Sequence, residues 1–145
     1  GFPASIGVKI AKPDRVVFDI SGDGSFQMNS QEMATVVQEN IPVIIAIFNN
    51  GYLGMVRQWQ ELFFDKRYSY TCIRNSVDFV KLAEAYGALG LRVKQPSEVR
   101  PAIEQAIASG RPTLIDFWVE CEENVSPMVP AGAAINEIMD LERKA

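Results

Sequence analysis

The chain has 145 residues, of which 48% are hydrophobic and 22% are charged, and its net charge is -4 at neutral pH. This composition is typical of one globular domain, and the acidic balance without a basic cluster excludes a nucleic-acid surface. No apolar run is long enough to span a bilayer, and the absence of histidine excludes Ser-His-Asp triads, Cys-His pairs and histidine metal sites.

The first third of the chain alternates helical and strand patterns. Residues 1–7 are typical of a loop that enters a helix, and such an abrupt start suggests a piece of a longer protein. The continuous apolar runs at 16–20 and 43–48 predict strands that are covered on both faces. Residues 30–39 between them carry apolar side chains at helical spacing, which predicts a connecting helix.

The middle of the chain begins with a segment that fits neither pattern. Residues 51–71 mix aromatic, charged and glycine residues, and we expect an irregular, functional loop. A helix is predicted at 77–86, with Ser76 as its N-cap and Gly87 as its end. A third buried strand follows at 89–93.

The last third continues the alternation. We predict a helix at 97–108 that Gly110 ends, a strand at 113–119, an irregular segment at 120–132 and a final helix at 134–142. Alternating strands and helices indicate an α/β fold, a three-layer doubly wound parallel sheet.

Two short polar signals follow the first two predicted strands. Gly22-Asp23-Gly24 and Asn49-Asn50 are separated by the 24 residues from Ser25 to Phe48. Either signal alone is usually a simple turn. Open α/β sheets, however, bind ligands at the carboxyl ends of their strands, and carboxylate and amide oxygens suit magnesium with a phosphorylated cofactor.

This pair of signals resembles the cofactor signature of thiamine-diphosphate enzymes. The flanking sequence is similar to the catalytic large subunit of acetolactate synthase, also called acetohydroxyacid synthase. The similar segments are Ser25-Phe26-Gln27-Met28-Asn29, Leu53-Gly54-Met55-Val56, Gln58-Trp59-Gln60, residues 78–87 and residues 125–132. The resemblance covers essentially the whole chain and implies that residues 1–145 are the C-terminal thiamine-diphosphate-binding domain of a longer, roughly three-domain enzyme.

The resemblance also implies site residues. Magnesium would be bound by the side chains of Asp23 and Asn50 and by the carbonyl of Tyr52. Thiamine diphosphate would contact Gly22, Asp23, Gly24, Ser25, Asn50, Tyr52, Leu53, Gly54 and Met55. The substrate channel would be bordered by Met55, Val56, Trp59 and Ala131, although Trp59 could instead fill a core.

The implied activity is that of a transferase in branched-chain amino acid biosynthesis. Pyruvate is decarboxylated, and its two-carbon unit is joined to pyruvate or 2-oxobutyrate to give 2-acetolactate or 2-aceto-2-hydroxybutyrate. No catalytic residue is expected in this chain, because the glutamate that activates the cofactor lies in the N-terminal domain of the family. We therefore expect the isolated chain to be inactive.

The implied partners are the N-terminal and middle domains, further copies in a dimer or tetramer, and a regulatory small subunit. FAD would bind in the middle domain of the full-length enzyme and not here. Two cysteines, Cys72 and Cys121, are too few for a disulfide scaffold, which favours a reduced, cytoplasmic protein. We expect Asp19 and Asp116, inside strands, to be structural and Arg57 to be solvated.

Two alternatives stay open. The chain could belong to another thiamine-diphosphate enzyme, such as a pyruvate oxidase, a glyoxylate carboligase or an oxo-acid decarboxylase. It could also be a stand-alone module that binds diphosphate without catalysis.

Overall fold

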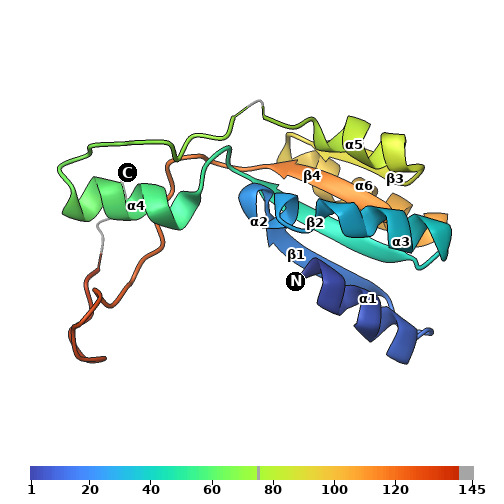
Figure 1. The fold of residues 1–145 in the computed structure, drawn as a ribbon, viewed down its shortest axis with the longest axis horizontal. Coiled ribbons are helices and arrows are strands. Elements are labelled where there is room, and N and C mark those ends of the chain that lie inside the picture. The colour runs from blue at the N-terminus through green and yellow to red at the C-terminus, as the bar shows by residue number, and fades with distance from the viewer. Residues whose placement is uncertain (75, 141–145) are drawn as a thin grey trace.

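Four apolar strands build one parallel sheet. The computed structural model describes residues 1–74 and 76–140. Its strands are β1 (Val17–Gly22), β2 (Val43–Asn49), β3 (Leu89–Val93) and β4 (Thr113–Trp118), and they lie side by side in the order β1-β2-β4-β3 (Figure 1). All three neighbouring pairs are parallel, so the carboxyl ends of the strands share one edge of the sheet.

One face of the sheet carries most of the helices. These are α1 (Phe2–Ala11), α2 (Asp23–Gln27), α3 (Met33–Gln38) and α5 (Phe79–Tyr86), with a 3₁₀ turn, η1 (Ser30–Glu32), before α3. Every second side chain of β2, such as Ile45, is buried against them. The ring of Phe26 lies 5.5 Å from that of Phe2 and 6.0 Å from that of Phe79, which joins α1, α2 and α5 in one core.

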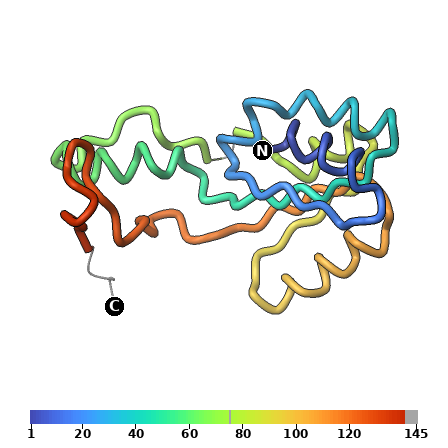
Figure 2. Tube along the Cα trace, turned by 90° about the horizontal axis from the view of Figure 1, so that it is seen from below, coloured from blue at the N-terminus to red at the C-terminus, as the bar shows by residue number. Residues whose placement is uncertain are grey.

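The opposite face is covered by α6 (Pro96–Ser109) (Figure 2). Ala102 and Ala106 of α6 pack against Ile44 and Ile115 in a second, smaller core. The predicted three-layer α/β fold is therefore confirmed. The cover is incomplete, because Phe18, Ile20 and Phe48 are exposed around a hollow of about 370 Å³ beside α6.

A further helix, α4 (Gly54–Phe63), extends away from the carboxyl edge of the sheet, and the chain after β4 leaves the same edge and passes beside it (Figures 1 and 2). The sequence predicted an irregular loop here, which was wrong. None of the helices in the described part of the chain has the length and apolar character that crossing a bilayer requires.

Three smaller predictions also need correction. The first helix begins at Phe2, so residues 1–7 are not a loop. Asp78, whose side chain accepts from the Lys81 amide at 3.2 Å, caps α5 in place of Ser76. Residues 134–140 form no helix, and the rest of that predicted helix lies outside the described residues. Gly87 does end α5, in the left-handed conformation expected of a C-cap.

Candidate cofactor site

The two polar signals meet at the carboxyl edge of the sheet. In the parallel register of β1 and β2, Gly22 lies opposite Phe48, so Asp23 and Asn50 leave neighbouring strands at nearly the same level. Gly22 ends β1, and Asp23, Gly24 and Ser25 form the first turn of α2. The amide of Gly51 donates to Asp23 Oδ2 at 2.8 Å, which ties the two loops together.

Asp23 is a buried carboxylate that is held by backbone amides. Its side chain and backbone are only 3% exposed, and its Oδ1 accepts from the Gly24 amide at 2.9 Å. Burial raises the pKa of Asp23 above its ordinary value, and the nearby charge of Asp116 adds to this. The backbone amides of Gly24, Gly51 and Asp23 itself offset only part of the rise. None of the ion pairs in the described part of the chain involves Asp23. A bound cation would therefore relieve an unfavourable burial.

The loop from Asn50 to Leu53 is held on its far side by a second segment. Gly51 accepts from the Ile73 amide at 2.8 Å, and the Leu53 amide donates to the Thr71 carbonyl at 2.9 Å. The side chain of Asn50 accepts from the Tyr52 amide at 3.1 Å. These hydrogen bonds hold the loop in shape, and it leads directly into Gly54 and Met55, the first turn of α4.

The loops that follow β1 and β2 approach each other closely at Gly24. A Cβ atom added to Gly24 would lie 2.7 Å from Leu53 Cδ2 and 3.3 Å from Ile73 Cδ1. Any larger residue here would require the end of the Leu53 side chain to move. The narrow gap therefore favours a glycine after Asp23.

The donor set fits a magnesium ion that is shared with a ligand. The described residues contain no group of three or more His, Cys, Asp or Glu side chains that could hold a metal. Asp23 supplies one carboxylate, and the Asn50 side chain and the Tyr52 carbonyl offer further hard oxygen donors in the loop whose Gly51 amide donates to Asp23. Magnesium often completes its shell with substrate phosphate oxygens and water, so the set suits a phosphorylated cofactor.

The outer side of α4 carries three of the predicted channel residues. Met55, Val56 and Trp59 are exposed and line a hollow of about 630 Å³ together with Gln60, Phe64 and Arg67. The ring of Trp59 meets that of Phe63 edge to face at 6.2 Å. Ala131, in contrast, is exposed on the C-terminal segment and does not line this hollow. The structure brings together three of the four predicted channel residues.

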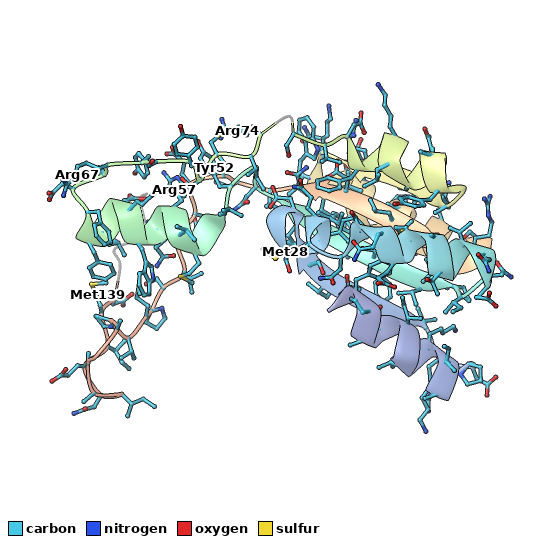
Figure 3. The ribbon with its side chains drawn as sticks, viewed as in Figure 1. Met28, Tyr52, Arg57, Arg67, Arg74 and Met139 are labelled. Atoms are coloured by element: carbon cyan, nitrogen blue, oxygen red, sulfur yellow. The ribbon has the colours of Figure 1, made fainter. Side chains whose placement is uncertain are left out.

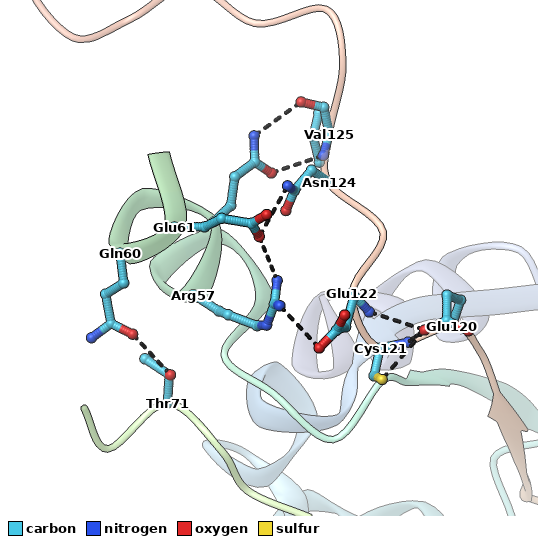
Figure 4. A network of polar contacts seen from close by, with 10 residues as sticks. Arg57, Gln60, Glu61, Thr71, Glu120, Cys121, Glu122, Asn124 and Val125 are labelled. Atoms are coloured by element: carbon cyan, nitrogen blue, oxygen red, sulfur yellow. Dashed lines mark hydrogen bonds and ion pairs between the residues drawn. The ribbon is translucent and has the colours of Figure 1, made fainter. Parts of the chain in front are cut away.

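The inner side of α4 is polar and buried (Figure 4). Arg57 forms ion pairs with Glu61 at 2.9 Å and Glu122 at 3.3 Å. Gln58 donates to the Val125 carbonyl at 3.0 Å and accepts from the Val125 amide at 2.8 Å. These contacts attach the C-terminal segment to α4 and thereby hold the apolar side of the helix outward.

Arg57 also joins α4 to the candidate site. Its guanidinium lies over the ring of Tyr52, 5.4 Å from the centroid, and Arg74 lies over the same ring at 5.0 Å (Figure 3). The prediction that Arg57 is solvated was therefore wrong. The pairing of Arg57 with Glu61 four residues later is the sequence signal that could have indicated a partnered arginine.

Comparisons with known proteins agree with this geometry. The family described as "Thiamine pyrophosphate enzyme, C-terminal TPP binding domain" matches residues 1–117. The chain is 47% identical over 140 residues to a probable acetolactate synthase large subunit of Methanococcus aeolicus, covering 97% of this chain and 23% of that protein. It is 50% identical over 141 residues to an acetolactate synthase of Mycobacterium leprae, again covering 23% of the relative and 94% of this chain.

A solved structure of a thiamine diphosphate-dependent enzyme has a similar fold. A thiamine diphosphate-dependent 4-hydroxybenzoylformate decarboxylase of Rhodococcus jostii RHA1 matches 85% of this chain with a TM-score of 0.79 and 34% identity. The match covers 23% of that protein. The chain thus spans about a quarter of the length of the relatives it matches.

Proposed function

Because the chain belongs to the thiamine pyrophosphate enzymes as a C-terminal TPP-binding domain, we propose that it is the cofactor-binding part of a longer acetolactate synthase large subunit. The observation that carries the proposal is the buried carboxylate of Asp23, which the Gly51 amide holds beside Asn50 at the carboxyl edge of the sheet. A buried carboxylate that no ion pair of the described residues neutralises is unfavourable, and the binding of magnesium would offset that cost.

The two loops would bind different parts of the cofactor complex. Asp23, the Asn50 side chain and the Tyr52 carbonyl would hold magnesium. The backbone of Gly22, Gly24 and Ser25 at the start of α2, and of Leu53, Gly54 and Met55 at the start of α4, would contact the diphosphate and the adjoining ring. Thiamine diphosphate, when bound, supplies a nucleophilic carbon and accepts the electrons that decarboxylation releases. This domain positions that carbon and excludes water from its diphosphate side.

The outer side of α4 is the substrate side of the proposed site. Met55, Val56 and Trp59 offer an apolar wall next to the first turn of α4, where the cofactor ring would lie. Such a wall suits the methyl group of pyruvate and the ethyl group of 2-oxobutyrate as acceptors. Ala131 lies outside this wall and is assigned to the channel only through its family resemblance.

The rest of the longer polypeptide would complete the site. The pyrimidine half of the cofactor and the activating glutamate are assigned to the N-terminal domain, and FAD to the middle domain. A homo-oligomer, a regulatory small subunit and a cytoplasmic location complete the proposal.

The test uses the full-length polypeptide that carries this domain. Binding of thiamine diphosphate with Mg²⁺ is measured by calorimetry, and product formation from pyruvate is followed with and without 2-oxobutyrate. Acetolactate and CO₂ are expected, together with 2-aceto-2-hydroxybutyrate in the mixture, and all should be lost in Asp23→Ala. A matched Asp14→Ala variant, which removes an exposed carboxylate far from the site, should retain activity.

Other products would favour the alternatives. Free aldehyde would indicate an oxo-acid decarboxylase, the activity class of the Rhodococcus jostii structure, which is 34% identical to this chain. Acetate or acetyl phosphate with peroxide would indicate a pyruvate oxidase, and activity on glyoxylate alone would indicate a glyoxylate carboligase. Cofactor binding without turnover of any of these acids would indicate a non-catalytic module.

A further inference from the structure

We propose that Asp116 is a positioning residue of the cofactor site, which acts through Asn49 to fix the point where the Asn50 loop leaves the sheet. The inference rests on the proposed function, because it concerns how the same loop is prepared for magnesium. The sequence offered only a structural role for Asp116.

Asp116 gathers donors from three strands. It lies in β4 and is 1% exposed. Its Oδ1 accepts from Asn49 Nδ2, at the end of β2, at 2.9 Å. Its Oδ2 accepts from Trp118 Nε1 at 3.0 Å and from Arg92 Nε, on β3, at 3.1 Å. One buried carboxylate therefore links β2, β3 and β4 at the edge of the sheet that carries the site.

Asn49 is held at its side chain by β4 and at its backbone by Val119, the residue directly after β4. Its side chain donates to Asp116, and its carbonyl accepts from the Val119 amide at 3.1 Å. The next residue is the proposed ligand Asn50, and the amide after it, of Gly51, donates to Asp23. A rotation at Asn49 would displace both proposed ligands relative to each other, so the two bonds from β4 set the geometry of the pair.

Asn49 would have room to move if Asp116 were absent. A hollow of about 550 Å³ lies on this side of the loop, and Asn49, Asn50, Arg92 and Asp116 are among the residues that line it. Packing alone therefore does not confine the Asn49 side chain. The hydrogen bond to Asp116 gives this side chain a fixed direction.

Burying a carboxylate to link strands costs desolvation free energy. An apolar residue at a buried strand position usually stabilises a fold at least as well as a buried ion pair does. Asp116 is nevertheless fully supplied with donors, and Arg92 continues the network to Asp78, the N-cap of α5. What a carboxylate adds is direction, because hydrogen bonds fix the orientation of Asn49 and apolar contacts would not.

The experiment is a double-mutant cycle in the full-length polypeptide. Asp116→Ala, Asn49→Ala and the double variant are titrated with Mg²⁺ at saturating thiamine diphosphate by calorimetry. Each single variant should raise the Kd for Mg²⁺ about tenfold, as expected for one lost hydrogen bond to a charged group, and the double variant should raise it no further. The turnover number at saturating Mg²⁺ should change by less than about threefold, because affinity and not chemistry is altered.

Trp118→Phe is the matched control. It removes one donor to Asp116 and keeps the aromatic ring, while the bond to Asn49 remains. Its Kd for Mg²⁺ should stay within about twofold of the wild type. An equal loss of affinity in Trp118→Phe would show a general structural role and would overturn the proposal.

Other outcomes also decide the matter. Additive effects of the two variants, or a loss in Asp116→Ala alone, would mean that the charge of Asp116 acts directly and not through Asn49. If Asp116→Ala does not fold, Asn49→Ala decides through amide exchange of residues 50–54 without cofactor, which should accelerate about tenfold, and unchanged exchange would overturn the proposal. Failure of the wild type to bind Mg²⁺ would overturn the proposed function, and the exchange measurement would still test the positioning role.

Discussion

Gly51→Ala would test how closely the loop is fitted around Asp23. Gly51 has a φ of +72°, which is unfavourable for any residue with a side chain. Its amide is bonded to Asp23 at 2.8 Å and its carbonyl to the Ile73 amide at 2.8 Å, so the backbone cannot shift without losing one of them. A Cβ atom here would lie 2.4 Å from Arg74 Cγ, which forces the arginine to move.

The expected loss of stability follows from these contacts. The left-handed conformation costs alanine about 1 kcal/mol relative to glycine. Moving Arg74 from the Tyr52 ring, over which it lies at 5.0 Å, removes about 0.5–1 kcal/mol of cation–π attraction. The sum of about 2 kcal/mol corresponds to a fall in Tm of about 4–8 °C for a domain of this size.

Gly110→Ala is the matched control for this prediction. Gly110 also has a positive φ, +60°, but an added Cβ would meet nothing within 4 Å. Thermal denaturation should therefore show a loss of about 1 kcal/mol, from conformation alone. The rise in Tm that Mg²⁺ and thiamine diphosphate produce should persist in Gly110→Ala and shrink in Gly51→Ala. Equal Tm losses in the two variants, with equal responses to cofactor, would refute the reasoning.

Two further predictions concern pH and the core. The affinity for Mg²⁺ should fall as the pH is lowered toward the pKa of Asp23, because burial raises that pKa and the cation binds the ionised form. Without Mg²⁺, the domain should become more stable as the pH falls through the pKa of Asp23, because the folded state then binds the proton more tightly than the unfolded state does. Calorimetry at several pH values measures both the affinity and the stability. Ile45→Ala should lower the free energy of unfolding by about 2–5 kcal/mol in urea titrations, because Ile45 is fully buried, whereas Ile20→Ala, at a position 65% exposed, should cost less than about 1 kcal/mol in the isolated chain. A similar loss of stability in both variants would contradict the description of one covered and one partly exposed face of the sheet.

The strands could be predicted because their continuous apolar residues indicate burial on both faces. Residues 43–48 are continuously apolar, and β2 lies at the centre of the sheet with cores on both faces. The positions of Asp23 and Asn50 after β1 and β2 followed from the same reading, since parallel strands end at one edge. The hydrogen bond from Gly51 to Asp23 could not be predicted, because its donor is a backbone amide, which nearly every residue carries.

Helix α4 was missed because the mixed aromatic, charged and glycine composition of residues 51–71 obscures the helical spacing of Met55, Val56, Trp59 and Phe63. Arg57 and Gln58 are buried against polar partners, while Met55, Val56 and Trp59 face outward. A sequence pattern shows which residues share one side of a helix but not which side is buried, so this inverted orientation could not be predicted. An inverted helix beside a predicted cofactor loop is consistent with a surface that another part of the protein covers.

The isolated chain should bind cofactor weakly and should not turn over pyruvate. Its relatives are about four times longer, and the outer side of α4, where substrate would lie, is open to solvent. Among the described residues, the carboxylate with a raised pKa is Asp23, which would be occupied by magnesium and is therefore unable to serve as a base. The chain has no histidine to replace it. Half of a cofactor site also loses most of the benefit of positioning, which supplies a large share of enzymatic rate enhancement.

CO₂ release from pyruvate should therefore be at background with saturating Mg²⁺ and thiamine diphosphate, and should appear in the full-length polypeptide that carries this domain. Turnover by the isolated chain at the rate of the full-length polypeptide would show that this domain holds the complete site.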